Sequence, residues 1–155
     1  MNIELRRFQS THLFQLRSIL TKETAEQCNL EWPFTKEVAE SFISSYNTWG
    51  IWINNGILAG AVEVKEDFET AYFVSEKYRN LGIATEAVML CKEEFPGKQL
   101  WCVINPKNTY SLKVANNATL RINGRTSTPK ITKDYIEKVF TTVFNNAGVT
   151  YNLKK

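Results

Sequence analysis

The sequence is poor in the residues that build metal centres and disulfide frameworks. It contains three cysteines and one histidine in 155 residues. Cys28, Cys91 and Cys102 are widely spaced and form no CxxC pair. The single histidine, His12, cannot complete a cluster of nitrogen ligands or support a histidine-based triad without further observations. We therefore expect no metal site, no disulfide framework and no catalysis that depends on His12.

Two nucleotide-binding patterns and a membrane span are also missing. Neither the P-loop pattern GxxxxGK[ST] nor the dinucleotide pattern GxGxxG occurs in the chain. No apolar run approaches the roughly 18 residues that a membrane span requires. The first residues, MNIELRRF, lack the apolar core of a signal peptide. We therefore expect one domain over residues 1–155, located in the cytoplasm and without membrane contact.

Charge is unevenly distributed along the chain. Residues 1–118 hold 12 lysines and arginines against 14 acidic residues, whereas residues 119–155 hold 7 against 2. A basic C-terminal section can face nucleic acid or an acidic partner. Its basic residues are spread out and belong to no nucleic-acid-reading motif, so we favour a solvated surface over a nucleic-acid site.

Apolar periodicity predicts a mixed α/β fold. Thr35 is expected to cap a helix whose apolar face comprises Val38, Ala39, Phe42, Ile43 and Tyr46. The other expected elements are a strand at 3–8, a helix from Ser10 or Thr11 to Leu20, a hairpin at 49–66 turning at Asn54-Asn55-Gly56, a strand at 69–74, a helix at 83–94, a strand at 99–104, a helix from Asn108 to Ala118, a strand at 119–122, an amphipathic helix at 132–146 and a last strand at 149–153.

The stretch FVSEKYRNLGIATEAVML, residues 73–90, joins an expected strand to an expected helix through a loop with Arg79 and Gly82. The first N–H groups of a helix have no partner within the helix, and the helix dipole is positive there. Glycine lets a large anion approach the backbone, and arginine adds a charge that pairs with phosphate. The loop therefore predicts an anion site suited to a pyrophosphate.

Two segments together carry a resemblance to a known family. The pattern R-x-x-G-x-A, formed by Arg79, Gly82 and Ala84, resembles the acetyl-CoA loop of the GNAT N-acetyltransferases. The later segment NPKNTYSLKVANNA resembles their N-x-x-S-x-x-V signature, and EWPFTKEVAESFI resembles the branch of ribosomal-protein and antibiotic N-acetyltransferases. Over about residues 3–122, the resemblance implies a single-domain, mostly antiparallel sheet flanked by helices, to which the helix at 132–146 is an addition.

The resemblance also implies which residues hold acetyl-CoA. It assigns the pantetheine arm to the strand ending at Phe73 and Val74, with the Val74 N–H facing the thioester oxygen. Asn108 and Ser111 complete the coenzyme site. The pyrophosphate is assigned to the loop of Arg79, Asn80, Leu81, Gly82, Ile83, Ala84 and Thr85.

Catalysis on an amine acceptor also needs a base and a proton donor. Glu69, at the start of the strand that would present the thioester, is the first choice for the base, and Glu31 is the second. Ala115 stands where many family members have a tyrosine that protonates the leaving thiolate, so Ser111 or a water is expected to serve.

Three classes of function remain open. The first is an enzyme that acetylates a primary amine, on a protein N-terminus or a small molecule, as a monomer or a homodimer. The second is an acyl-CoA sensor without turnover, which Ala115 favours. The third is an interaction module that uses the basic C-terminal helix. Release of coenzyme A on addition of amines separates the first two, and a salt-dependent shift with RNA would support the third.

Overall fold

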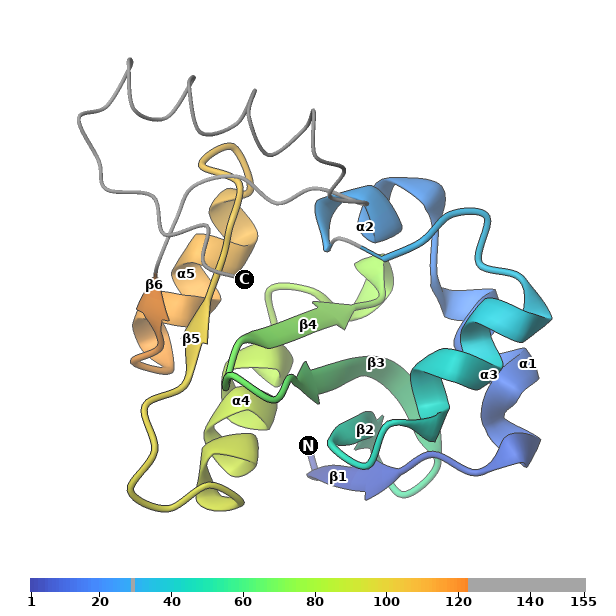
Figure 1. The fold of residues 1–155 in the computed structure, drawn as a ribbon, viewed down its shortest axis with the longest axis horizontal. Coiled ribbons are helices and arrows are strands. Elements are labelled where there is room, and N and C mark those ends of the chain that lie inside the picture. Colours follow the sequence, from blue (N-terminus) through green and yellow to red (C-terminus); the bar gives the residue numbers. More distant parts are fainter. Residues whose placement is uncertain (29, 123–155) are drawn as a thin grey trace.

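The computed structural model describes residues 1–28 and 30–122, and its centre is a four-stranded antiparallel sheet (Figure 1). The predicted helix at 132–146 and the predicted strand at 149–153 lie outside the described residues. A parallel pair, β5 (Trp101–Cys102) and β6 (Arg121–Ile122), forms a second, small sheet. The strands of the main sheet, in spatial order, are β1 (Ile3–Arg7), β2 (Thr48–Ile53), β3 (Ile57–Val64) and β4 (Thr70–Val74).

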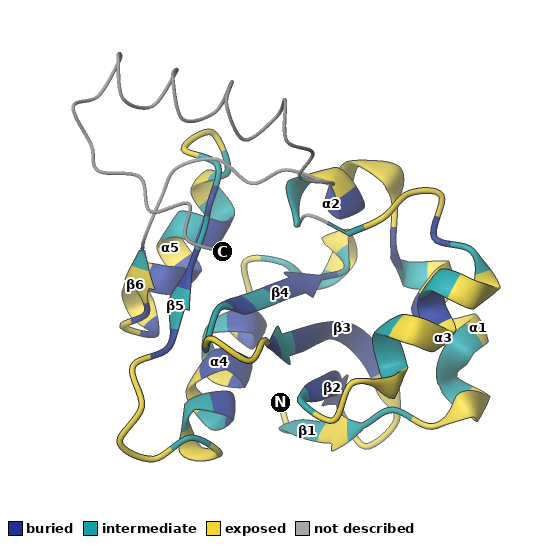
Figure 2. Cartoon of the chain, viewed as in Figure 1, coloured by how far each residue is buried: buried dark blue, intermediate teal, exposed yellow. Residues whose placement is uncertain are grey.

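Helices cover both faces of the main sheet, as Figures 1 and 2 show. One face packs against α4 (Ile83–Glu93) and α5 (Thr109–Asn117). The other packs against α1 (Leu13–Ile19), α2 (Lys22–Gln27) and α3 (Lys36–Ser44). The short 3₁₀ helices are η1 (Ser10–His12) and η2 (Glu76–Tyr78). The predicted mixed α/β fold with a mostly antiparallel sheet is confirmed.

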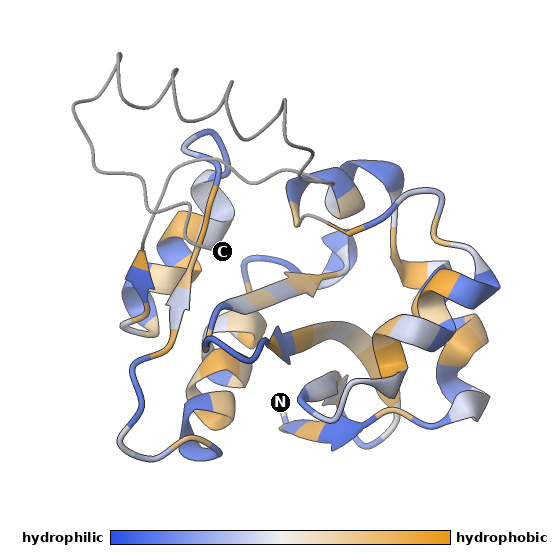
Figure 3. Ribbon diagram, viewed as in Figure 1, coloured by the Kyte–Doolittle hydropathy of each residue, from blue (hydrophilic) through white to orange (hydrophobic). Residues whose placement is uncertain are grey.

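Strand alternation divides the core into two layers. Tyr72 and Val74 pack toward α4, whereas Phe73, between them, packs toward α1 and α3. Apolar residues lie on β3, α1 and α4 in Figure 3, while the turns are mostly hydrophilic.

Local sequence signals correctly predicted one hairpin turn and the starts of two helices. Asn54 and Asn55 turn the β2–β3 hairpin with φ angles of 49° and 67°. The Thr35 side chain accepts a hydrogen bond from the Val38 N–H and caps α3. The Asn108 side chain does the same for α5 by accepting from the Ser111 N–H.

Other expectations need correction. The predicted helix from residue 10 to Leu20 is a 3₁₀ turn followed by α1, and α2 was not predicted, although Thr21 caps it through the Thr24 N–H. Tyr46 is not on the apolar face of α3, because that helix ends at Ser44 and the tyrosine is 76% exposed under the Arg7 guanidinium. The predicted strands at 99–104 and 119–122 shorten to two residues each in β5 and β6.

The strands β4 and β5 meet only at one end. Glu69 and Trp101 form an isolated parallel bridge just before β4 begins, and the Trp101 N–H donates to the Phe68 carbonyl at 3.2 Å. Beyond this point the two strands diverge (Figure 1). Most of β4 therefore presents an edge that is not paired with β5.

Candidate functional site

The edge of β4 that diverges from β5 carries backbone N–H and C=O groups at every second residue. The Ser75 N–H donates to the Ala59 carbonyl of β3 at 2.7 Å, so residue 75 faces β3. Alternate residues of a strand direct their backbone groups to opposite edges, so the N–H and C=O groups of Tyr72 and Val74 point away from β3. Contacts of both carbonyls agree, because Cys28 Sγ lies 3.4 Å from the Tyr72 oxygen and Arg79 Nε lies 2.9 Å from the Val74 oxygen. An extended ligand can pair with this edge as an added strand.

Glu69 and Ser111, predicted from separate motifs, line the same cleft beside this edge. The cleft also includes Lys65, Cys28 and Asn108. It is bounded by α2, β4, the segment that contains β5, and the start of α5. The structure thus brings together two of the three predicted catalytic residues.

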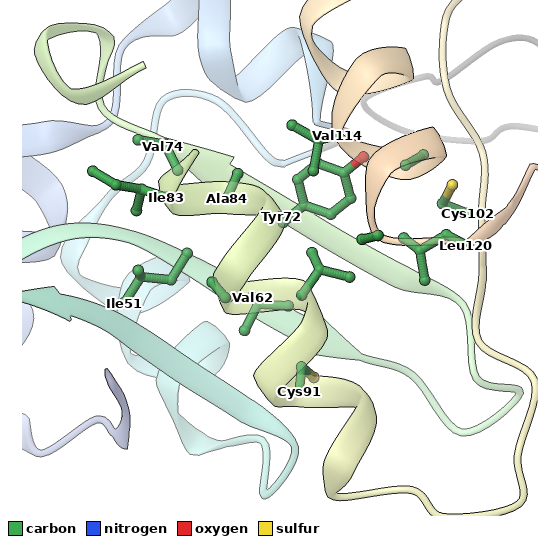
Figure 4. Close-up of a cluster of buried hydrophobic side chains, with 14 of the residues drawn as sticks. Ile51, Val62, Tyr72, Val74, Ile83, Ala84, Cys91, Cys102, Val114 and Leu120 are labelled. Atoms are coloured by element: carbon green, nitrogen blue, oxygen red, sulfur yellow. The ribbon is translucent and has the colours of Figure 1, made fainter. Parts of the chain in front are cut away.

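Tyr72 sets the spacing between β4 and α5. Its hydroxyl donates to the Ser111 carbonyl at 2.8 Å, and Figure 4 shows the hydroxyl oxygen directed toward α5. Burial raises the pKa of Tyr72, so its hydroxyl stays protonated and keeps donating. Ser111 is only 8% exposed, which makes it a wall of the cleft rather than a surface residue.

The loop between β4 and α4 combines positive φ angles with open space beside the backbone. Gly82 precedes α4 with φ of 78°, and Asn80 also has a positive φ of 62°. A Cβ atom built on Gly82 would meet nothing within 4 Å, so the space beside it is open. A second cleft joins this loop to α5, where Tyr110 and Lys113 line it.

Within the loop, side chains and backbone serve different purposes. Ile83 and Ala84 are each 1% exposed in the core, so only their N–H groups can meet a ligand at the start of α4. Leu81 is 55% exposed, and Asn80, Ala84 and Thr85 line the second cleft. The free N–H groups and the helix dipole make this end of α4 suited to an anion.

Arg79 is engaged with the protein itself. Besides Val74, its guanidinium donates to Thr24 Oγ1 at 2.8 Å and lies 5.6 Å from the centre of the Tyr110 ring. It therefore joins α2, the end of β4 and α5. The sequence predicted a positive charge for this loop, and the structure places that charge at the junction of three elements.

The remaining predicted residues occupy different environments. Phe73 and Val74 are buried on opposite faces of β4, and the Asn108 side chain caps α5 while lining the cleft. Glu31 is exposed in the linker between α2 and α3 and is not among the residues that line the cleft of Glu69 and Ser111. Ala115 is fully buried, so no side chain from that position reaches either cleft.

Glu69 lies at the narrow end of the diverging strands. Its carboxylate pairs with Lys65 Nζ at 3.3 Å, and its N–H donates to Asp67 Oδ1 at 3.1 Å. Because a strand rises about 3.3 Å per residue, Glu69 is roughly 16 Å along the chain direction from Val74. Glu69 and Val74 therefore cannot both contact one reacting carbon directly. Glu69 would act on it through a water, or on a ligand group that extends along the edge of β4.

Sequence reasoning missed three polar residues near the clefts. Lys113 and Tyr110 face the loop from α5, and Glu63 lines a pocket on the opposite face of β4. The signal for Glu63 was present, because GAVEVKE places a carboxylate inside an apolar strand. Lys113 had no local signal, since it resembles any exposed lysine on a helix.

Comparison with known proteins assigns the family. A sequence-family model described as an acetyltransferase (GNAT) domain matches residues 2–121. The chain belongs to the GNAT acetyltransferase family. Among curated proteins, no sequence match was found.

Solved GNAT structures share the fold at low sequence identity. The GNAT acetyltransferase from Bacillus anthracis has a TM-score of 0.57 at 20% identity, covering 76% of this chain and 79% of its own. A ribosomal L7/L12 alpha-N-protein acetyltransferase, RimL, has a TM-score of 0.56 at 18% identity, covering 74% of each chain. A GNAT acetyltransferase from Colwellia psychrerythraea reaches 0.58 at 15% identity over 76% of this chain and 46% of its own.

The described part of the chain offers neither a metal-binding cluster nor a membrane-spanning helix. Residues 1–28 and 30–122 contain no group of three or more histidine, cysteine or acidic side chains placed to hold a metal ion. No helix among them is long and apolar enough to cross a bilayer.

Proposed function

We propose that this GNAT protein transfers the acetyl group of acetyl-CoA to a primary amine, on a protein N-terminus or on a small molecule. The observation that supports the proposal is that the unpaired edge of β4 and the Gly82 loop are continuous in the chain. The open edge of β4 leads directly into the Gly82 loop, so an extended arm and an anionic group can be bound in sequence by one stretch of chain. The cytoplasmic location and the homodimer or monomer state remain predictions.

The residues present fit acetyl-CoA. The N–H groups of Tyr72 and Val74 would pair with the pantetheine arm, and the N–H groups at Gly82, Ile83 and Ala84 would bind the pyrophosphate. The open space beside Gly82 supports this assignment. When bound, acetyl-CoA supplies an activated acetyl group as a thioester. An N–H such as that of Val74, directed at the thioester oxygen, typically contributes about 3–4 kcal/mol to lowering the barrier.

The chain must also remove a proton from the acceptor. An alkyl ammonium has a pKa of about 10.4, and only the neutral amine that it forms on losing a proton is nucleophilic. We assign this step to Glu69, acting through water because of its distance along β4, with Glu31 as the second candidate. Ser111, in the wall of the same cleft, would donate a hydrogen bond to the departing thiolate.

The class of acceptor is supported by likeness rather than by geometry alone. One solved relative is an acetyltransferase of a ribosomal protein α-amino group. The acidic pair of Glu63 and Glu69 near the clefts is compatible with a cationic amine.

A second candidate is binding of acyl-CoA without turnover. The fully buried Ala115 favours it, because the position that carries a tyrosine in many relatives offers no proton donor here. This candidate predicts coenzyme binding with no release of coenzyme A in the presence of any amine.

The test combines binding and turnover. The parent should melt at a higher temperature with acetyl-CoA, by mass action, and should release coenzyme A with peptides, polyamines or aminoglycosides. Gly82→Val should weaken binding, because the side chain fills the open space and strains a φ of 78°. Gly56→Val, whose added Cβ also meets nothing within 4 Å, is the matched control in a distant turn. Binding without turnover across the panel would favour the sensor, and absence of binding would reject both candidates.

A further inference from the structure

A small, mostly apolar pocket adjoins the cleft of Glu69 and Ser111 on the sheet face that carries α3. Its residues come from the segment that follows α2, from α3, and from β3 and β4. They are Cys28, Leu30, Phe42, Ala61, Glu63, Ala71, Tyr72 and Phe73. Cys28, Ala71 and Tyr72 also line the cleft of Glu69 and Ser111, so the two spaces share a wall. Glu63 is the only acidic side chain in that lining.

The Glu63 carboxylate has no hydrogen-bonded or ion-paired partner within the described part of the chain, although the charge of Lys65 acts on it. Among residues 1–28 and 30–122, no hydrogen bond or ion pair is made by its side chain. Burial raises the pKa of Glu63, Lys65 opposes this change and Glu69 adds to it. Burial also raises the pKa of the neighbouring Cys28 thiol to about 12, so that group is neutral. Glu63 is half-buried, and a partly desolvated carboxylate in an apolar wall favours a cation beside it, because pairing offsets part of the desolvation cost.

We propose that Glu63 binds the ammonium group of the acceptor, and that this pocket selects primary amines with an apolar group near the amine and no carboxylate on the neighbouring carbon. The inference rests on the proposed function, since it names the acceptor subsite of that reaction. The occupant is fixed by charge complementarity with Glu63 and by the apolar side chains of Leu30, Phe42 and Phe73.

Glu63 is well placed to deliver an amine to the edge of β4. It is the direct partner of Ala71 in the β3–β4 ladder, one residue before Tyr72. Neighbouring strands are about 4.8 Å apart, so the backbone of Glu63 is one strand spacing from that of Ala71, and both residues line the pocket. Glu69, by comparison, is already occupied by Lys65.

The same charges explain which amines should be refused. A free amino acid carries a carboxylate beside its amine, and Glu63 and Glu69 both act against a second anion in this region. A peptide N-terminus or an alkylamine has no such charge. Selection should therefore follow the group attached to the amine-bearing carbon.

The first experiment measures steady-state kinetics with butylamine, alanine amide and free alanine as acceptors. The parent should acetylate the amine and the amide, and its kcat/KM for free alanine should be at least about 10-fold lower. Glu63→Gln should raise KM for the cationic acceptors roughly 10- to 100-fold, the loss expected for a hydrogen bond to a charged group, and should leave KM for acetyl-CoA unchanged. Glu66→Gln, which makes the same substitution in the exposed turn after β3, should match the parent.

The second measurement excludes a purely structural role for Glu63. Its folded-state pKa is raised, so ionisation of this group costs stability as pH rises above its ordinary value near 4.5. Glu63→Gln should therefore melt at a higher temperature than the parent at pH 7 and near the parent's temperature at pH 4. Lys65 and Glu69 are the charged groups that act on Glu63, and both are unchanged in this variant. A variant that binds amines less well while being more stable would identify a binding residue.

The outcomes separate this inference from the proposed function. An unchanged amine KM in Glu63→Gln, or equal use of alanine and alanine amide, overturns the inference while acetylation itself stands. If the parent acetylates no amine, the proposed function fails. The pocket assignment then survives only if butylamine raises the melting temperature of the parent and not that of Glu63→Gln.

Discussion

Replacing Arg79 with alanine tests whether this residue holds the site together. The change removes two hydrogen bonds from a charged donor, to the Val74 carbonyl at 2.9 Å and to Thr24 Oγ1 at 2.8 Å. Bonds of this kind contribute about 1.5–3 kcal/mol each. Arg79 is half-buried, and Thr24 keeps the hydrogen bond that the Thr21 hydroxyl donates at 3.0 Å, so we take the lower part of the range. The free energy of unfolding should fall by roughly 3–4 kcal/mol.

The assay is thermal unfolding without ligand, followed by ligand titration. For a chain of this size, 1 kcal/mol corresponds to about 2–4 °C, so Arg79→Ala should melt roughly 6–16 °C below the parent. Lys77→Ala removes an exposed positive charge from the same loop and should melt with the parent. Thr24→Val, which deletes one partner of Arg79, should show part of the loss.

Ligand binding then distinguishes two roles for Arg79. Because its guanidinium is bonded to the end of β4, we expect Arg79→Ala to bind both acetyl-CoA and acetyl-pantetheine more weakly, by about 10-fold for a loss near 1.4 kcal/mol. A loss confined to acetyl-CoA would mean that Arg79 contacts the pyrophosphate instead. A variant with the parent's melting temperature and the parent's affinities would refute both roles.

Three further substitutions probe the sheet and the chemistry. Gly60→Ala would place a Cβ 2.0 Å from the Phe73 carbonyl oxygen, so β3 and β4 must separate, and urea unfolding should show a loss of roughly 3 kcal/mol; unchanged stability would contradict this packing. Glu69→Gln should lower turnover about 10²- to 10⁴-fold at pH 7, with a deficit that shrinks at higher pH as free amine accumulates, and a variant as fast as the parent would remove Glu69 from the mechanism. Ser111→Ala should lower kcat and spare acetyl-CoA affinity, whereas the reverse pattern would make Ser111 a binding residue.

The elements predicted best from the sequence are those fixed by neighbours in the chain. The caps at Thr35 and Asn108 each require a partner only three residues away. Gly82 and the Asn54-Asn55 turn depend on backbone conformations that few residue types adopt. Local chemistry therefore located the turn and the caps of both motifs to which we assign the coenzyme.

Features that depend on distant contacts were missed. Arg79 donates a hydrogen bond to Thr24, which is 55 positions away in the sequence, and no sequence pattern around Arg79 or around Thr24 predicts this contact. Likewise, the lengths of β5 and β6 are set by how far the two strands pair with each other, which is two residues. The apolar run in each segment is longer than this pairing and does not predict it. The interruption of an apolar strand by Glu63 was visible, but its meaning required the pocket around it.

Hydrogen exchange at individual backbone N–H groups tests the central claim most directly. Acetyl-CoA should slow exchange at Tyr72 and Val74 on the free edge of β4, and at residues 82–85 at the start of α4. Acetyl-pantetheine, which lacks the pyrophosphate, should protect the two strand positions alone. Unchanged exchange at all these positions in the presence of saturating acetyl-CoA would contradict the account, as would protection confined to the distant cleft between β1 and α4 that Glu4, Glu93 and Glu94 line.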